Sequence, residues 1–347
     1  MRGVAKTRRE TGAMEVIDRP RPTPGPAEAL VEVAYTGLCG SDAGIYEFED
    51  AFEVMDLPTV IGHEYAGTVV EVGADVHGLS PGDTVVERPI RNCGDCFQCR
   101  TGVPNLCADA AITGVHHDGA WAGYIAVPAE SLHAIPDDME LWRAALTEPT
   151  SVATRAVTHN SRVRPGDNVL VEGPGPIGLL TAQLATAQGG DVVVSGVGSD
   201  AAHRLPLAAE LGARAVDVTE TDLETVVAAE TDGIGFDVVF DTTGHPSGIE
   251  NARDAVRKGG QVVVVGLPDT IEVDFTPFVR SEIDLQCSYT ATWHEFERAV
   301  RVLDEGVIDA EAMVDRSFSL LDVDAAFEAF LAGEVCKPLF DASELRA

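Results

Sequence analysis

Four cysteines stand close together in the first half of the chain, where they could bind a metal ion. Two, two and seven residues separate them in a polar loop: Cys93, Cys96, Cys99 and Cys107. Four thiolates this close can surround one Zn²⁺ tetrahedrally, and because all four positions would be filled, the site would be structural rather than catalytic. Free cysteines or a redox pair are the alternative, but adjacent thiols without a metal would be open to oxidation. The spacing therefore predicts a structural zinc site.

A second set of metal-ligand residues is scattered along the chain: Cys39, His63, Glu64 and Glu148. They stand in the turn-like contexts Leu-Cys-Gly-Ser-Asp, Ile-Gly-His-Glu-Tyr-Ala-Gly and Leu-Thr-Glu-Pro. One thiolate, one imidazole and one or two carboxylates suit a zinc site that keeps an open or exchangeable position. An isolated residue of any of these types is more often structural, so the residue types alone leave both interpretations open.

A glycine-rich turn in the second half is typical of nucleotide binding. The turn reads Gly-Pro-Gly-Pro-Ile-Gly, and its expected contact residues are Gly173, Gly175, Pro176, Ile177 and Gly178. It follows an apolar strand expected over 168–172 and precedes a helix expected over 177–188. This order predicts a dinucleotide site, because N–H groups at the helix N-terminus can approach a pyrophosphate. A turn that merely joins a strand to a helix is the alternative.

The end of the next strand bears on the choice between NAD and NADP. An acidic residue that binds the adenosine ribose is expected about 20 residues on, but the chain has Gly196, 18 residues after Gly178. Without that carboxylate a 2′-phosphate is not repelled, and candidate phosphate partners lie nearby: Ser195, Ser199, His203 and Arg204. The pattern favours NADP modestly, while Asp200 in the same turn keeps NAD open.

Two kinds of secondary structure must position these residues. From about residue 29 to 127 the chain has short β-type runs punctuated by glycine and proline, which predicts a mostly β domain over 1–152. From 153 to 289 apolar strands alternate with helices, among them helices expected over 201–211 and 248–257. This alternation predicts a doubly wound α/β domain with a parallel sheet. Residues 290–347 are expected to return to the first domain, with helices over 295–305 and 323–331 and a final strand at 338–340.

Composition excludes several classes of function. The 347 residues include 57 acids and 24 bases, for a formal net charge of −33. A field this negative argues against nucleic acid and anionic membranes as partners. Only three of the bases are lysines, and the acids are spread along the whole chain, a pattern that resembles proteins of high-salt cytoplasm, where salt screens repulsion between carboxylates. An ordinary acidic protein is the alternative.

The chain shows no sign of export. It begins with a basic, polar stretch rather than an apolar signal-peptide segment, and no run approaches the roughly 18 apolar residues of a membrane helix. Seven cysteines in this context favour metal binding or catalysis over disulfides. We therefore expect a soluble, cytoplasmic protein.

Several motifs together resemble one known family. They are, in chain order, Cys39-Gly40-Ser41-Asp42, Gly62-His63-Glu64-Tyr65-Ala66-Gly67, the four-cysteine loop, Glu148-Pro149 and the glycine turn. The chain is thus similar to the zinc-containing medium-chain alcohol dehydrogenases, and to their polyol (sorbitol-type) and threonine dehydrogenase branch. The resemblance implies a GroES-like catalytic domain, an inserted Rossmann domain, two zinc ions per subunit, and a homo-oligomer, usually a tetramer or dimer.

The resemblance also implies roles for individual residues. Cys39, His63 and Glu64 would bind the catalytic zinc, with Glu148 as fourth ligand directly or through water. Zinc would act as a Lewis acid that lowers the pKa of the substrate hydroxyl before hydride passes to the nicotinamide. Ser41 matches the hydroxyl of the family's proton relay; alternatively it caps a helix that begins at Asp42. The cofactor would also be lined by Thr242 and Gly266, whose alternative role is in ordinary strand-end turns.

Departures from the family pattern limit what can be said of the substrate. Gly44 and Ile45 stand where many relatives carry a relay histidine. Tyr289 matches the tyrosine of an Arg-Tyr pair in the polyol branch, but the arginine is missing. Residues 86–89 replace a stretch that contains a histidine in threonine enzymes, whereas residues 46–56 look rather like theirs.

The sequence favours oxidation of a secondary hydroxyl of a polyol, sugar or sugar acid to the carbonyl. A threonine 3-dehydrogenase-like enzyme is the first alternative. A non-catalytic nucleotide- and zinc-binding scaffold is the second, although such a protein could lose Cys39, His63 or Glu148, and all three are present. A zinc-free quinone reductase is disfavoured because its relatives lack both sets of ligands.

Overall fold

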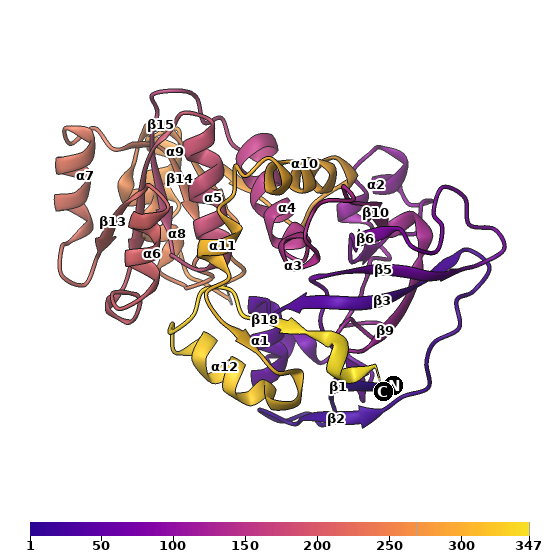
Figure 1. Cartoon of the computed structure of the whole chain (residues 1–347). Helices are drawn as coiled ribbons and strands as arrows, with labels where there is room; N and C mark the ends of the chain where they lie inside the picture. The colour runs from indigo at the N-terminus through magenta and orange to yellow at the C-terminus, as the bar shows by residue number, and fades with distance from the viewer. Residues whose placement is uncertain (269, 347) are drawn as a thin grey trace.

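The computed structural model describes residues 1–268 and 270–346. Figure 1 shows two parts, one built on antiparallel strands that carry both chain ends and one built on a parallel sheet flanked by helices. The expected combination of a mostly β domain with a doubly wound parallel sheet is confirmed.

The antiparallel part is organised around one long strand, β3, which pairs with β5 on one side and with β9 and β18 on the other. Alternate residues of β3 face the core, and two irregularities in its register with β5 bend the sheet. The strands of this part are β1 (Arg2–Lys6), β2 (Met14–Asp18), β3 (Glu28–Gly37), β4 (Thr59–Val60), β5 (Tyr65–Val72), β6 (Thr84–Glu87), β7 (Ile90–Arg91), β8 (Ala111–Ile112), β9 (Tyr124–Pro128) and β10 (Leu132–Ala134).

The end of the chain joins this same sheet. Strand β18 (Leu339–Asp341) pairs antiparallel with β3, and β17 (Ser317–Phe318) pairs with β18. Helix α12 (Val323–Leu331) packs against α1 (Gly40–Glu47), where the rings of Phe327 and Tyr46 stack with centroids 4.3 Å apart. The last residues therefore lie beside the segment that carries Cys39.

The second part contains six parallel strands in the order β13-β12-β11-β14-β15-β16. They are β11 (Asn168–Glu172), β12 (Asp191–Gly196), β13 (Arg214–Asp217), β14 (Phe236–Asp241), β15 (Val256–Val264) and β16 (Asp284–Cys287). The central strands are apolar on both faces because helices cover both, as in other doubly wound sheets. The strand order reverses between β11 and β14, and ligands of such sheets bind at the carboxyl ends of the strands at this point.

The helices follow the expected alternation with small differences at their ends. The helix expected from residue 201 begins at Arg204, because residues 198–200 form a short 3₁₀ turn; the helix expected to end at 257 ends at Ala255, where β15 begins. The remaining α-helices are α2 (Phe97–Arg100), α3 (Leu141–Ala144), α4 (Thr147–Arg155), α5 (Pro176–Ala187), α6 (Arg204–Glu210), α7 (Leu223–Thr231), α8 (Gly248–Ala255), α9 (Thr276–Arg280), α10 (Trp293–Asp304) and α11 (Ala310–Met313).

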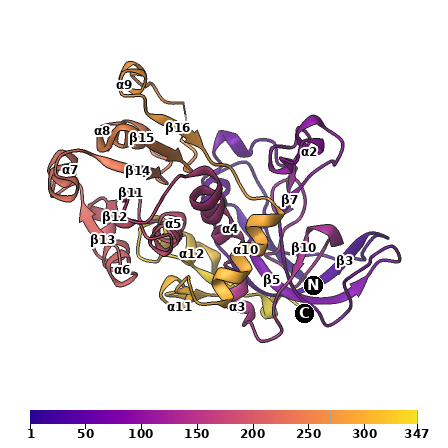
Figure 2. The ribbon, with the colours of Figure 1, turned by 90° about the horizontal axis from the view of Figure 1, so that it is seen from above.

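Helices α4 and α10 lie side by side at the centre of the molecule (Figure 2). They are joined by an ion pair between Arg155 and Glu295, 3.3 Å apart and almost fully buried. Glu295 also accepts the N–H of Thr292, which caps the start of α10. Within the described chain, no helix combines the length and the apolar character that crossing a membrane would need.

Candidate active site and metal centres

Three of the scattered candidate ligands meet in space. Cys39 precedes α1, just after β3, while His63 and Glu64 immediately precede β5. Because the end of β3 and the start of β5 are antiparallel neighbours, joined by the N–H of Gly37 to the carbonyl of Glu64 (2.7 Å), the two segments converge. The ligand atoms of Cys39, His63 and Glu64 all lie within 4.8 Å of one another. This arrangement fits one bound metal ion.

A buried aspartate lies beside His63. Asp42 is fully buried; one carboxylate oxygen accepts the N–H of Cys39 at 2.9 Å, and the other lies 3.7 Å from Nδ1 of His63. Burial raises the pKa of Asp42. Burial also acts to lower the pKa of His63, but Asp42, Cys39 and Glu148 outweigh it and raise that pKa well above its usual value. The negative groups around His63 therefore favour a positive charge at this place.

A buried lysine holds one oxygen of Glu64. The Nζ of Lys337 forms an ion pair with Oε2 of Glu64 and donates to the carbonyl of Leu38 at 2.9 Å. Burial acts to lower the pKa of Lys337, but Glu64, Cys39 and Glu148 raise it above its usual value. The other oxygen of Glu64, Oε1, is buried and has no hydrogen-bond partner among the described residues. That free oxygen fits the role of a metal ligand.

Glu148 lies near this group but not within it. Its carboxyl is not among the atoms that lie within 4.8 Å of one another. It lies in the first turn of α4, and burial raises its pKa to about 7, against the opposing effect of His63. Glu148 could therefore bind the same metal ion directly only after a movement of its side chain, or indirectly through a bridging water.

Ser41 lies in the first turn of α1. The helix begins at Gly40 rather than at Asp42, so Ser41 does not cap it; Cys39 occupies the cap position. The capping alternative is therefore wrong, because the Asp42 carboxylate reaches back to the Cys39 N–H and starts the helix two residues earlier. The Ser41 side chain remains free for another role.

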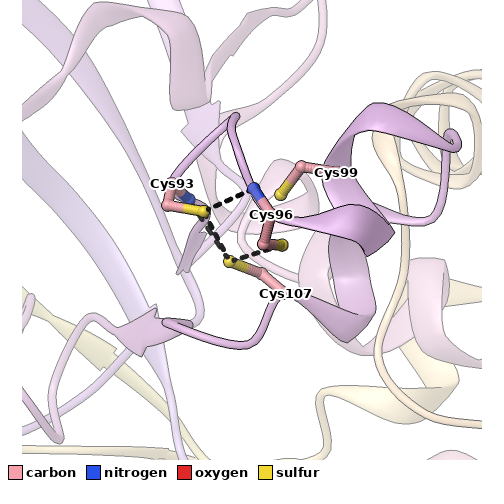
Figure 3. Close-up of side chains that lie close together, drawn as sticks. All are labelled: Cys93, Cys96, Cys99 and Cys107. Atoms are coloured by element: carbon pink, nitrogen blue, oxygen red, sulfur yellow. Dashed lines mark hydrogen bonds between the residues drawn. The ribbon is translucent and has the colours of Figure 1, made fainter.

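The four cysteines of the loop gather around one centre (Figure 3). The sulfur of Cys107 lies 3.5 Å from that of Cys93 and 3.9 Å from that of Cys96. The N–H of Cys96 donates to the sulfur of Cys93, and the N–H of Cys93 to that of Cys107, both at 3.3 Å. Backbone N–H groups of Ala108 and Cys99 lower the pKa of Cys96 to about 6. Four convergent sulfurs with backbone donors fit a tetrahedral zinc site.

The glycine turn has the close packing that a dinucleotide site needs. A Cβ at Gly178, in the first turn of α5, would collide with the carbonyl of Gly173, so only glycine lets the helix approach the strand. By contrast, a Cβ at Gly175 would meet nothing within 4 Å, which leaves the helix N-terminus open to a ligand. The hydroxyl of Thr242, at the end of β14, donates to the carbonyls of Glu172 (2.7 Å) and Gly173 (3.0 Å). The turn thus lies where the strand order reverses.

The turn after β12 is crowded around Gly196. A Cβ there would lie 2.9 Å from Pro174, 3.0 Å from Leu205 and 3.1 Å from the Asp200 carboxylate. Asp200 is buried and accepts the N–H of Val197 at 3.1 Å, while the neighbouring Ser199 is exposed and Ser195 is buried.

Other predicted cofactor residues are placed differently. The guanidinium of Arg204, expected from the sequence beside a phosphate, donates instead to carbonyl oxygens of Phe330 and Val335. Gly266 packs so closely on Gly244 that a Cβ would collide with its backbone nitrogen. Gly266 lies in the loop that follows β15, whereas Arg204 begins α6.

Three contacts were not predicted from the sequence. Lys337 and Asp42 support the ligands, and the side chain of Asn105 donates to the carbonyl of Tyr289 at 3.1 Å, which ties the four-cysteine loop to the chain before α10. The only sequence signal for Lys337 is its rarity, since the chain has three lysines among 24 bases.

Two family models match the chain. Residues 25–137 match the alcohol dehydrogenase GroES-like domain, and residues 176–305 match the zinc-binding dehydrogenase model. Curated relatives align over nearly the whole length. The sorbitol dehydrogenase of Halalkalibacterium halodurans is 36% identical, covering 98% of both chains. The D-arabitol-phosphate dehydrogenase of Enterococcus avium is 34% identical, covering 99% of this chain and 98% of the relative.

An L-threonine 3-dehydrogenase of Anaeromyxobacter is 33% identical, over 98% of this chain and 99% of the relative. Among solved structures, a zinc-binding dehydrogenase from Sinorhizobium meliloti bound to NADP superposes with a TM-score of 0.88 at 29% identity, covering 98% of both chains. An alcohol dehydrogenase from Escherichia coli complexed with NADH superposes with a TM-score of 0.89 at 30% identity, covering 98% of this chain and 99% of that one. The similarity extends across both parts of the molecule.

Proposed function

Because the chain belongs to the zinc-dependent medium-chain alcohol and polyol dehydrogenase family, as an NAD(P)-linked alcohol oxidoreductase, we propose that it oxidises a secondary hydroxyl of a polyol, sugar or sugar acid to the carbonyl. The observation that carries this proposal is the convergence of Cys39, His63 and Glu64 within 4.8 Å, with the buried side chains of Asp42 and Lys337 beside them. A scaffold protein with no catalytic role would have no need of this ligand set.

The proposed catalytic zinc would be held by Cys39, His63 and Glu64, with Glu148 close by. When bound, it would supply Lewis-acid chemistry, which lowers the pKa of a substrate hydroxyl and stabilises the developing charge. Asp42, whose carboxylate lies 3.7 Å from Nδ1 of His63, would support the His63 ring, as carboxylates beside metal-ligating histidines commonly do. Lys337 pairs with one oxygen of Glu64, and the other has no hydrogen-bond partner among the described residues, which leaves it for a metal ion. We propose Ser41 as the group that accepts and passes on the substrate proton.

The second proposed zinc would be held by the four cysteines, with a structural role. We therefore expect two zinc ions per subunit on metal analysis of the purified protein, and a value of one or none would contradict this assignment. Thiolate ligands of this kind persist in a reducing compartment, which supports the proposed cytoplasmic location.

The substrate class follows from the relatives and from two positions in the chain. Sorbitol and arabitol-phosphate dehydrogenases are similar to the chain over its whole length. Tyr289 is half-exposed and precedes α10, where the polyol branch carries its substrate tyrosine. The threonine enzymes remain the second candidate because their identity to this chain is only slightly lower.

A panel of substrates tests the proposal. Polyols, sugars, sugar acids, sugar phosphates and L-threonine would be offered with NAD or NADP in concentrated KCl, following nicotinamide absorbance. We expect kcat/KM to be largest for a polyol or sugar compound. Turnover confined to L-threonine would establish the second candidate, and no turnover with any compound in zinc-loaded protein would favour the scaffold alternative.

For the cofactor we propose a modest preference for NADP. It is supported by Gly196, which offers no carboxylate to the ribose and stands in a crowded turn, and by the exposed Ser199 hydroxyl. Asp200 lies in the same turn and is the group that would favour NAD. A KM for NAD equal to or below that for NADP would overturn the preference and assign the ribose to Asp200.

Three broader properties are also proposed. The excess of acids supports adaptation to high salt, so activity should rise with KCl toward molar concentrations; a maximum in dilute buffer would contradict this. Family membership supports a dimer or tetramer, which sedimentation would show. We divide the chain into a catalytic domain of residues 1–152 and 290–347 and a cofactor domain of residues 153–289.

A further inference from the structure

We propose that residues 333–337 form a strap that couples the cofactor's adenosine end to the catalytic carboxylate of Glu64, and that Arg204 is the positioning residue that fixes this strap. The segment follows α12 and leads into β18, both in the antiparallel part of the molecule. Arg204 begins α6, in the parallel-sheet part. The inference rests on the proposed dinucleotide site, because the turn that Arg204 follows is the one expected to bind the adenosine ribose.

At the cofactor end, Arg204 donates to backbone carbonyls of the other part of the chain, and its Nη1 also lies 3.7 Å from the Asp200 carboxylate in its own part. Its Nη2 donates to the carbonyls of Phe330 (2.8 Å) and Val335 (3.1 Å), and its Nε to Val335 again (3.2 Å). The guanidinium also lies 5.3 Å from the centroid of the Phe330 ring, and only 15% of the side chain is exposed. Three hydrogen bonds to backbone carbonyls fix the orientation of the guanidinium, and few of its N–H groups remain available to a ligand.

A second contact reinforces the first. The His203 ring, next to Arg204, bonds to the carboxylate of Asp315, and the same carboxylate oxygen accepts the N–H of Cys336 at 2.8 Å. Gly333 approaches the turn directly: a Cβ on it would lie 3.3 Å from the carbonyl of Ser199, and its φ of +73° is one that glycine adopts easily. The strap therefore approaches the turn after β12 at Gly333, and at Val335 it contacts Arg204 at the start of α6.

At the catalytic end, the strap finishes at Lys337. This residue forms the buried ion pair with Glu64 and donates to the carbonyl of Leu38, while the next carbonyl, of Pro338, accepts the N–H of Leu38 at 3.2 Å. Two residues of extended chain span roughly 7 Å, at about 3.3–3.6 Å each. Val335, whose carbonyl accepts from Arg204, therefore lies no more than about 7 Å along the chain from Lys337, which pairs with the carboxylate of Glu64.

In Figure 1 the yellow chain between α12 and β18 runs between these two regions, from the neighbourhood of α6 to that of α1. Because packed protein segments transmit displacements rather than absorb them, a shift of the ribose turn should move Lys337 and with it Glu64. Arg204 would thus support the binding of either cofactor without contacting a cofactor phosphate. Through the strap it would also position the Glu64 carboxylate for hydride transfer.

The first experiment separates this role from direct recognition of a 2′-phosphate. In Arg204→Leu we expect KM to rise by the same factor, about tenfold, for NAD and for NADP, with kcat lowered several-fold, because misplacement of a binding site costs both steps. Arg204→Lys, which keeps a donor for one carbonyl, should recover part of each loss. The matched control is Arg214→Leu, which removes an exposed arginine of β13 that pairs with Asp191 and Glu230. This substitution should change neither KM nor kcat.

Cofactor affinity without turnover gives an independent measurement. Enhancement of nicotinamide fluorescence on mixing protein with NADH or NADPH should show the same parallel loss for both cofactors in Arg204→Leu. A loss confined to NADPH would overturn the strap and restore Arg204 as a phosphate partner. No binding of either cofactor by the unaltered chain would instead overturn the proposed function, so the two failures are distinguishable.

A double-mutant cycle tests the coupling itself. If the strap connects the two ends, the effects of Arg204→Leu and Lys337→Met on kcat should be strongly non-additive, with the double variant close to the worse single variant. Effects that simply multiply would show that Arg204 and Lys337 act separately, and would overturn the proposal. Should Arg204→Leu fail to fold, as judged by circular dichroism in concentrated KCl, Arg204→Lys and Gly333→Ala take its place, with the same parallel rise in both KM values expected at a smaller size.

Discussion

The two groups of metal-ligand residues are built in opposite ways. The four cysteines come from a single loop of 15 residues, most of them are partly or fully exposed, and they are arranged by backbone N–H groups within that loop. The group of Cys39, His63 and Glu64 comes from the ends of two strands and is surrounded by side chains from distant parts of the chain.

This difference in construction implies a difference in function. In the cysteine loop every candidate ligand is of one type and the donors around it are backbone groups, which suits a site that only has to hold its ion. In the other group, ligands of mixed type are supported by a buried carboxylate and a buried ammonium, which orient individual ligand atoms. We therefore expect substitutions in the cysteine loop mainly to lower stability, and substitutions in the group of Cys39, His63 and Glu64 mainly to lower turnover.

The largest expected effect is the loss of turnover in Cys39→Ser. Because Lewis-acid stabilisation is worth several kcal/mol, kcat should fall by at least about a thousandfold, with the fold retained. Kinetics and circular dichroism would measure the two quantities, and zinc content should fall by one ion per subunit. Cys287→Ser, which replaces an exposed cysteine outside both groups, is the control. Retained activity in Cys39→Ser would remove the basis of the comparison.

Asp42→Asn should produce the next largest loss. The amide can still accept the Cys39 N–H, but the charge that faces His63 is gone, and loss of such support typically lowers activity about 10- to 100-fold. Steady-state kinetics at matched zinc content would measure this loss of activity. The control is Asp50→Asn, at an exposed position of the 3₁₀ turn Asp50–Phe52. An unchanged kcat would mean that the His63 ring is oriented by something else.

In the cysteine loop we expect the opposite pattern. Cys96→Ser should lower Tm by on the order of 10 °C, because structural zinc contributes directly to folding, while kcat of the folded fraction changes less than about twofold. Scanning calorimetry in concentrated KCl, with activity measured below the transition, separates the two. A collapse of kcat with an unchanged Tm would reverse the roles assigned to the two groups.

The smallest effect concerns Glu87, a buried residue at the end of β6. Its carboxylate accepts from Thr113 at 3.0 Å, and burial raises its pKa from about 4.5 to about 7, against the opposing effect of Arg91. Between these two values the folded protein keeps a proton that the unfolded chain has released, so the contribution of Glu87 to stability falls as pH rises through this window.

Glu87→Gln should remove that part of the pH dependence. Urea unfolding at constant salt from pH 4.5 to 7.5 would show a free energy of unfolding that declines less steeply with pH in the variant than in the parent chain. Glu71→Gln, on an exposed position of β5, is the control. Parallel pH profiles for Glu87→Gln and the parent chain would contradict the raised pKa.

Much of the fold is visible in the sequence because it depends on short-range patterns. Apolar strands alternating with helices predicted the parallel sheet, and the glycine turn lies between a strand and a helix as expected. Element ends were less well predicted: Arg204 starts its helix three residues later than expected, since a 3₁₀ turn held by Asp200 precedes it. Contacts of that kind involve side chains whose partners are not adjacent in sequence.

The sequence by itself determined the nature of the chain's chemistry: four thiols at metal-binding spacing, a glycine turn in the right context, and the ligand types of a second metal group. These depend on residue identity and local order. Only the tertiary structure decided that Cys39 meets His63 and Glu64, that Glu148 stands apart from them, and that Lys337 and Arg204 connect the chain's end to both sites. Those relations arise where strands and loops distant in sequence pack together, and buried charges must then find partners wherever the fold places them.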